Sequence, residues 1–140
     1  MSLKVLIVDD ESDVARYLAM IVQANGFIPK VANNVEDGLE IVNDFKPDLV
    51  CLDIMMPKES GVSMYQQLRE NKATRHIPVI IISGAEQEEK FDFRNYLPDE
   101  SVPEPECYME KPVDVDKYIA MIKRLTTGDS IEGGGNDDEA

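Results

Sequence analysis

The sequence has few of the residues that bind soft metals or form disulfides. Its only histidine is His76, and its two cysteines, Cys51 and Cys107, form no Cys-X-X-Cys motif. A structural zinc site needs about four such ligands, so we expect none. Both cysteines lie in apolar, strand-like stretches, which favours two buried and reduced thiols.

Basic residues are also scarce, because 14 lysines and arginines face 28 aspartates and glutamates, for a net charge of −14. Phosphate groups repel so acidic a chain, so we expect no direct binding to nucleic acid or to a membrane. No stretch approaches the ~18 consecutive apolar residues of a transmembrane helix. The start, MSLKVLIVDD, is too short and too acidic for a secretory signal. These absences predict a cytoplasmic protein.

The length of 140 residues and the hydrophobic content of 43% fit one domain with a single substantial core. Near the end, the stretch IEGGGNDDEA is rich in glycine and acids and has no bases. We therefore expect a domain over residues 1–127 and a flexible acidic tail or linker over residues 128–140.

Apolar, strand-like runs alternate with helical patterns along the expected domain. We expect strands within residues 4–10, 27–32, 48–53, 77–83 and 107–110, and helices within 12–25, 34–45, 61–71, 86–96 and 114–125. The proline-rich stretch LPDESVPEPE, residues 97–106, is expected to be a loop. This alternation predicts an α/β fold in which helices cover both faces of a parallel sheet.

Chemically active side chains stand at the ends of four of the expected strands. Asp9 and Asp10 end the first strand, Asp53 the third and Ser83 the fourth, while Lys111 follows the fifth. Parallel strands bring their carboxyl ends to one edge of the sheet, where such folds bind ligands. Three carboxylates there repel one another by about 4 kcal/mol per pair at ~4 Å and an effective dielectric constant of ~20. Oxygen ligands suit a hard divalent ion, and a half-open site suits Mg²⁺.

Most of these residues also have an ordinary explanation when taken alone. An aspartate after a strand often caps the next helix, which applies to Asp10. Ser83 fits a turn, and Lys111 fits a solvated charge. Asp53 is harder to explain, because it interrupts an apolar run and a buried carboxylate without a partner is costly. The joint pattern is what favours a site.

Four motifs follow one another along the chain: LIVDDE at residues 6–11, LDIMMPKESG at 52–61, IPVIIISG at 77–84 and YMEKP at 108–112. Together they resemble the receiver domain of bacterial two-component response regulators, from residue 4 to about residue 125. The resemblance implies a flavodoxin-like, doubly wound sheet of five parallel strands in the order 2-1-3-4-5.

The resemblance also implies roles for the residues at the strand ends. Asp53 would accept a phosphoryl group, and Ser83 and Lys111 would bind its oxygens. Mg²⁺, or Mn²⁺ in its place, would be held by Asp9, Asp10, Asp53 and the backbone carbonyl of Met55.

By the same resemblance, Ser83 and Tyr108 form a conformational switch, and the Lys111–Pro112 bond is cis. The implied function is a signalling switch that takes a phosphoryl group onto Asp53 from a histidine kinase or a histidine phosphotransfer protein. It is not an enzyme beyond its own Mg²⁺-dependent phosphorylation and dephosphorylation. A downstream protein or output domain would bind the face formed by the segment after Ser83, Tyr108 and the last helix. A phosphorylation-dependent homodimer is a further candidate.

The chain departs from the family pattern in two places. The spacing from Ser83 to Lys111 is longer than in a typical receiver, and the excess lies in residues 97–106. We interpret this stretch as a tolerated surface insertion, with an acidic docking surface as the alternative. Neither Met55 nor Ala85 has a polar side chain to orient an attacking water, which predicts a long-lived acyl phosphate.

Two other functions remain open. A phosphotransferase or phosphatase acting on small substrates could also use an aspartyl-phosphate intermediate. Such enzymes, as in the haloacid-dehalogenase-like class, resemble Asp-X-Asp at the nucleophile, whereas this chain has Asp53 followed two residues later by Met55. An inactive receiver that serves only as an interaction module conflicts with the complete set of site residues.

Overall fold

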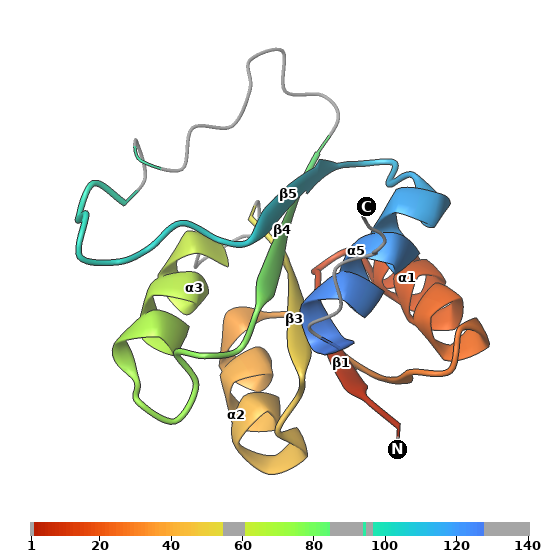
Figure 1. Cartoon of the computed structure of the whole chain (residues 1–140), viewed down its shortest axis with the longest axis horizontal. Helices are drawn as coiled ribbons and strands as arrows, with labels where there is room; N and C mark the ends of the chain where they lie inside the picture. Colours follow the sequence, from red (N-terminus) through yellow and green to blue (C-terminus); the bar gives the residue numbers. More distant parts are fainter. Residues whose placement is uncertain (1, 55–60, 85–93, 95–96, 128–140) are drawn as a thin grey trace, which may run out of the picture.

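The computed structural model of the chain describes residues 2–54, 61–84, 94 and 97–127. Its elements are β1 (Lys4–Val8), α1 (Ser12–Ala24), β2 (Ile28–Ala32), α2 (Val35–Phe45), β3 (Leu49–Asp53), α3 (Gly61–Glu70), β4 (Val79–Ser83), β5 (Cys107–Glu110) and α5 (Val115–Thr127). The strands are parallel and follow the order β2-β1-β3-β4-β5 (Figure 1). The predicted doubly wound α/β fold is confirmed.

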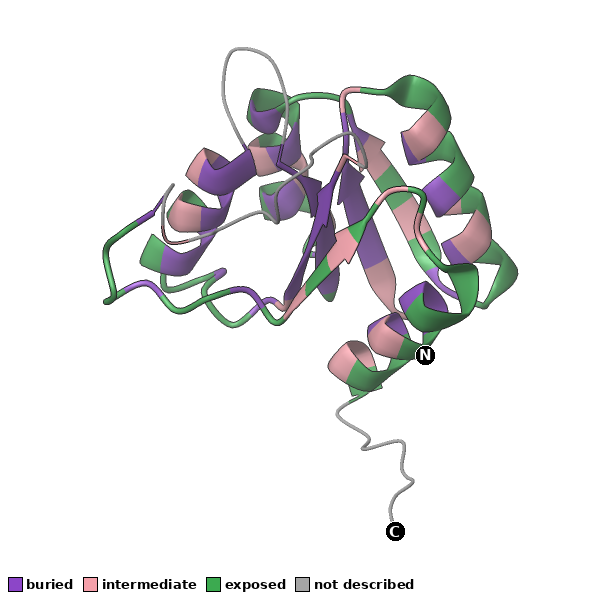
Figure 2. Ribbon diagram, turned by 90° about the horizontal axis from the view of Figure 1, so that it is seen from above, coloured by how far each residue is buried: buried purple, intermediate pink, exposed green. Residues whose placement is uncertain are grey.

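Each face of the sheet carries its own hydrophobic core, because alternate residues of a strand point to opposite faces. One core lies under α2 and α3 and includes Leu6, Leu52, Met64 and Leu68. The other lies under α1 and α5 and includes Ile7, Leu18, Ile80 and Ile122. β3 and β4 are buried along their whole length (Figure 2). Packing from both sides therefore fixes the ends of these two strands.

Polar residues and a glycine set the ends of the helices. Asn34 accepts a hydrogen bond from the backbone N–H of Asp37 at 2.7 Å and caps α2. Asp114 accepts one from the backbone N–H of Lys117 at 3.2 Å and begins α5. Gly26 follows α1 with φ of +92°, a conformation that glycine adopts without strain. The chain thus turns back toward the sheet where the sequence predicts.

The two cysteines differ in their surroundings. Cys51 lies in the core under α5, and its Sγ is 3.4 Å from the hydroxyl of Tyr118. Burial raises the pKa of the Cys51 thiol to about 12, so it stays protonated and unreactive at neutral pH. Cys107 is only partly buried, and both thiols are free. The expectation of two buried thiols is therefore right for Cys51 and wrong for Cys107.

Several predictions from the sequence fall outside the described residues. These are the helix over residues 86–96 apart from Arg94, the carbonyl of Met55, and the tail over residues 128–140. The division into a domain and a tail therefore stays a prediction.

Residues 97–106 contain no helix or strand, as predicted, but they are not confined to the surface. Leu97 and Val102 are 6% and 4% exposed and belong to the core under α3. The hydroxyl of Tyr65 in α3 donates a hydrogen bond of 2.6 Å to the carbonyl oxygen of Pro103. Figure 1 shows the same arrangement, with this stretch (teal) running beside α3. Whether the stretch is a tolerated insertion or a docking surface stays a prediction. Most of its residues are exposed, as a surface insertion would be, but Leu97 and Val102 anchor it in the core.

Truncation of a core residue in this stretch tests that conclusion. Leu97→Ala is expected to lower the free energy of unfolding by about 2–4 kcal/mol, because it removes buried methyl groups and leaves a cavity. Urea denaturation monitored by circular dichroism measures the change. Met20→Ala is the control, because Met20 is 62% exposed on α1 and its loss should change stability by less than about 0.5 kcal/mol. Equal effects of the two substitutions would contradict the packing.

Candidate functional site

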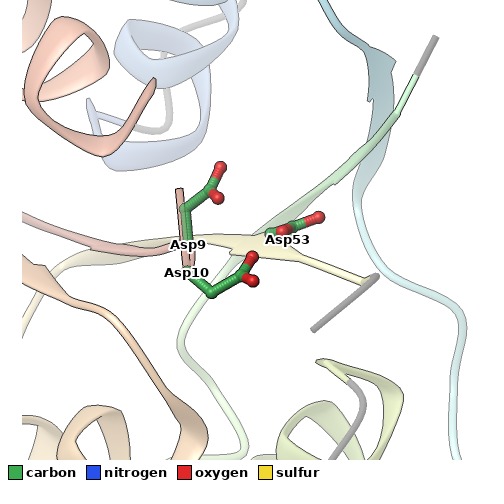
Figure 3. A group of neighbouring side chains, drawn as sticks. All are labelled: Asp9, Asp10 and Asp53. Atoms are coloured by element: carbon green, nitrogen blue, oxygen red, sulfur yellow. The ribbon is translucent and has the colours of Figure 1, made fainter. Parts of the chain in front are cut away.

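Three aspartates meet at the carboxyl edge of the sheet. Val8 of β1 pairs with Leu52 of β3, so the residues that follow, Asp9 and Asp53, reach the edge side by side. Asp10 is the next residue along the chain, and Figure 3 shows the three side chains as neighbours. One carboxylate oxygen from each lies within 4.8 Å of the others. Asp9 and Asp53 are 1% and 3% exposed, so this cluster is largely removed from water.

The fourth and fifth strands bring Ser83 and Lys111 to the same edge. Asp53 pairs with Ile82 of β4, and Ser83 comes next in that strand. Ser83 pairs in turn with Glu110 of β5, and the backbone N–H of Lys111 donates a 2.8 Å hydrogen bond to the Ser83 carbonyl oxygen. All four predicted strand ends therefore converge. The Lys111–Pro112 bond is cis, as the resemblance implied.

The ammonium group of Lys111 lies among carboxylates. Its Nζ is 2.9 Å from Oδ2 of Asp9, 3.6 Å from Oδ2 of Asp53 and 2.8 Å from Oε1 of Glu11. Burial lowers the pKa of Lys111, but hydrogen bonds to Glu11 and Asp9 and the charge of Asp53 outweigh it, so the net shift is upward. Lys111 is therefore a permanent positive charge in the site and not a solvated surface lysine.

Two neighbouring residues fix Asp9, and sequence reasoning missed both. The backbone N–H of Glu11 donates to Oδ1 of Asp9 at 2.9 Å, and the side-chain amide of Asn33 donates to the Asp9 carbonyl oxygen at 2.9 Å. Glu11, not Asp10, is the N-cap residue of α1. The ordinary explanation of Asp10 as a helix cap is therefore wrong. A signal for Glu11 existed, since it directly follows the two predicted acids.

Gly61 allows the backbone after Asp53 to turn closely. A Cβ atom at Gly61 would overlap the carbonyl oxygen of Asp53, and the Gly61 N–H donates a 3.1 Å hydrogen bond to the Ile54 carbonyl oxygen. Only glycine fits such an approach without a backbone shift. The start of α3 is thereby held against the carboxyl end of β3, where Asp53 lies.

The donor set at this edge fits a hard divalent cation. Asp9, Asp10 and Asp53 each offer a carboxylate oxygen, whereas Lys111 supplies one positive charge against them. The cluster therefore keeps an excess of negative charge, which a cation would relieve. Carboxylates without histidine or thiolate favour Mg²⁺ or a similar ion over zinc.

Tyr108, the predicted switch residue, lies away from the aspartates. It pairs with Ile81 across β4 and β5, and its side chain is 42% exposed. Its hydroxyl donates a 3.1 Å hydrogen bond to Oε1 of Glu104. His76 is exposed in the turns that precede β4, at the opposite edge from the site.

Comparison with protein families decides what this arrangement is. The model of the response regulator receiver domain matches residues 5–123, which is most of the chain. The chain belongs to the response regulator receiver family. Receiver domains act as phosphorylation-dependent signalling switches, and they interact with histidine kinases or phosphotransfer proteins and with output domains.

Individual relatives of this receiver domain support the same family assignment. The phosphate regulon transcriptional regulatory protein PhoB of Escherichia coli (strain K12) is 32% identical over 126 residues, which cover 89% of this chain and 52% of PhoB. The polar-differentiation response regulator DivK of Brucella anthropi is 27% identical over 121 residues, covering 85% of this chain and 92% of DivK. The receiver domain of Francisella response regulator 1452 superposes with a TM-score of 0.74 at 26% identity, covering 91% of this chain and 98% of that one.

The receiver domain spans about half the length of some of the curated relatives it matches, for example 52% of PhoB. In the part of the chain that the structure describes, no helix has the length and apolar character needed to cross a membrane.

Removing one carboxylate from the cluster tests its electrostatics. Without divalent cations, Asp10→Asn is expected to unfold at a higher temperature than wild type, because two charges ~4 Å apart repel by about 1 kcal/mol even at the dielectric constant of water. Millimolar Mg²⁺ should stabilise the wild type and have little effect on Asp10→Asn. Thermal unfolding with EDTA or Mg²⁺ measures both effects.

Asp44→Asn is the matched control, since Asp44 is an exposed acid in the last turn of α2. This turn lies at the edge of the sheet opposite the cluster, where the Phe45 carbonyl oxygen accepts a hydrogen bond from Lys4 at the start of β1. It should respond to Mg²⁺ as the wild type does. Equal stabilisation of wild type and Asp10→Asn by Mg²⁺ would show that the cluster is not a cation site.

Proposed function

We propose that this receiver domain is switched by transfer of a phosphoryl group to the carboxylate of Asp53. The observation that supports this most strongly is the position of Asp53: it is 3% exposed, at the end of a central strand, and 3.6 Å from the permanent positive charge of Lys111. A carboxylate oxygen attacks a phosphoryl group readily when nearby positive charge neutralises the transferred oxygens. The proposed donor is a histidine kinase or a histidine phosphotransfer protein.

The chain's own residues divide the work of the transfer. Asp53 is the nucleophile, the Lys111 ammonium pairs with one phosphoryl oxygen, and the Ser83 hydroxyl donates a hydrogen bond to another. Gly84 follows Ser83 without a side chain to block the donor. Bound Mg²⁺, or Mn²⁺, would supply further positive charge to the phosphoryl oxygens, and its proposed ligands are Asp9, Asp10, Asp53 and the backbone carbonyl of Met55.

Phosphorylation changes the charge of the site and thereby the loops around it. The phosphoryl group adds about 1.5 to 2 negative charges, which attract Lys111 and the Ser83 hydroxyl. Both residues lie at strand ends that continue into loops, so their movement is coupled to the face that carries Tyr108 and α5. We propose that Tyr108 turns inward in the phosphorylated state and that a downstream protein, an output domain or a second copy of the chain binds this face.

Two finer properties belong to the same proposal. Self-phosphorylation and self-dephosphorylation at Asp53 are its only chemistry, and the apolar Met55 side chain favours a long-lived acyl phosphate. We also propose a cytoplasmic location, which the two free thiols support because cytosolic conditions keep cysteines reduced. No contact in the described site favours the alternative of a small-substrate phosphatase.

Chemical phosphorylation tests the role of Asp53. Incubation of the wild type with acetyl phosphate and Mg²⁺ should add the mass of one phosphoryl group, about 80 Da, in intact-protein mass spectrometry, and EDTA should prevent it. Asp53→Asn should show no adduct, because an amide is a poor nucleophile. Lys111→Met should slow adduct formation at least tenfold, because the developing negative charge loses its nearest cation.

Asp44→Asn serves again as the control and should form the adduct at the rate of the wild type. An adduct of normal yield in Asp53→Asn, or no adduct in the wild type, would overturn the proposal.

A further inference from the structure

The stretch of residues 97–106, which we call the clasp segment, is fixed at two points against α3. The first is the 2.6 Å hydrogen bond from the Tyr65 hydroxyl to the carbonyl oxygen of Pro103. The second is the ion pair between Arg69 and Glu106, with Nη2 3.0 Å from Oε1. Tyr65 and Arg69 are one helical turn apart and both are buried, with exposures of 0% and 8%. These anchors hold the clasp segment on either side of Glu104.

The buried guanidinium of Arg69 makes this attachment specific. Besides Glu106, it donates to the Tyr65 hydroxyl at 3.1 Å and to the carbonyl oxygens of Arg75 and Ile77 at 3.1 and 2.7 Å. The Glu106 carboxylate also accepts a 2.9 Å hydrogen bond from the backbone N–H that begins β4. Loss of Glu106 would leave the buried Arg69 guanidinium without its counter-ion, so the pair is costly to break.

The backbone of Glu104 is consequently held in place by its neighbours, independently of the contacts of its side chain. It lies between Pro103 and Pro105, whose rings restrict the backbone, and Pro105 is itself buried. Its carboxylate accepts the 3.1 Å hydrogen bond from Tyr108, and its second oxygen is 3.9 Å from Nε of Arg94. Because the backbone is already ordered, the contact with Tyr108 carries less of the entropic cost that weakens most surface contacts.

The pKa of the Tyr108 hydroxyl is consistent with its role as the hydrogen-bond donor in this contact. Partial burial raises the pKa of the Tyr108 hydroxyl, and the hydrogen bond to the Glu104 carboxylate raises it further. The hydroxyl is therefore protonated at physiological pH and remains a donor to Glu104.

We propose that Glu104 is a latch that holds Tyr108 in its outward position and so opposes the switch. This inference rests on the proposed function, in which Tyr108 turns inward after phosphorylation. The inward turn must break the hydrogen bond to Glu104, so the contact stabilises the inactive state alone. A contact present in only one of two states shifts their equilibrium by its own free energy. The clasp segment thereby sets the amount of phosphorylation that is needed to activate the domain.

The side-chain position of Tyr108 is the direct readout. Protein labelled with ¹³C-tyrosine gives ring signals by NMR, and comparison with Tyr108→Phe assigns those of Tyr108 among the 5 tyrosines. In Glu104→Ala, without any phosphoryl analogue, these signals should move toward the positions seen with the wild type saturated by Mg²⁺ and beryllofluoride. Glu100→Ala is the matched control, because Glu100 is an exposed acid of the same segment. Its signals should stay at the wild-type positions.

The affinity for beryllofluoride, a stable analogue of the phosphoryl group, is the second readout. Glu104→Ala should bind it roughly threefold to tenfold more tightly than the wild type, the effect of one ordinary hydrogen bond. Glu100→Ala should bind it as the wild type does. In Tyr108→Phe, which lacks the hydroxyl, the additional Glu104→Ala substitution should change the affinity much less than it does in the wild type.

Equal affinities and unchanged Tyr108 signals in Glu104→Ala would overturn the latch, and so would identical effects of Glu104→Ala and Glu100→Ala. Failure of the proposed function has a different signature, namely no beryllofluoride binding by the wild type. In that case the comparison of free proteins still decides whether Glu104 holds the tyrosine: the Tyr108 signals should differ between the wild type and Glu104→Ala but not between the wild type and Glu100→Ala.

Discussion

The position of one ammonium group among buried carboxylates is the constraint on which the site depends. Asp9 and Asp53 are almost fully excluded from water, and their charges are compatible with folding because Nζ of Lys111 lies 2.9 and 3.6 Å away. Lys111 can occupy that place because β5 is in register with β4 and its backbone N–H bonds to the Ser83 carbonyl oxygen. Any group that brings or removes charge at Asp53 must therefore change the contacts of Lys111, and through them the connection to β5.

The two cores make the edge rigid at β3 and β4. At β5, which contacts the clasp segment, the packing is less complete. β3 and β4 are packed from both faces, so Asp53 and Ser83 have little freedom to move. β5 is an edge strand with alternately exposed residues, and Tyr108 of this strand contacts Glu104 of the clasp segment. When the charge at the rigid acid cluster changes, β5 can therefore move more easily than β3 or β4. Tyr108 and Glu104 are in contact at this strand.

Local signals in the sequence were sufficient for much of the fold and for the grouping of the candidate site residues at one edge of the sheet. Parallel strands must end at a common edge, so Asp9, Asp53, Ser83 and Lys111 could be placed together without coordinates. The contacts of Arg69 with Glu106 could not be predicted, because they join residues 37 positions apart and the helical pattern around Arg69 does not indicate which distant loop residue the helix meets. For the same reason, the prolines and acids of residues 97–106 indicated a loop correctly but gave no sign that Leu97 and Val102 are buried. Burial of a loop depends on the surface it meets, here α3, and not on its own composition.

The central claim is that Lys111 and a divalent cation both act as counter-charges for the same carboxylates. It is tested most directly by the stability of Lys111→Met in urea with EDTA or with Mg²⁺, beside Lys123→Met, which removes an exposed charge from α5. The account predicts that, without divalent cations, Lys111→Met loses about 3 kcal/mol, the usual effect of removing one partner of a buried ion pair. It also predicts that Mg²⁺ stabilises Lys111→Met more than it stabilises the wild type or Lys123→Met. Equal stabilisation of all three proteins by Mg²⁺ would contradict the account.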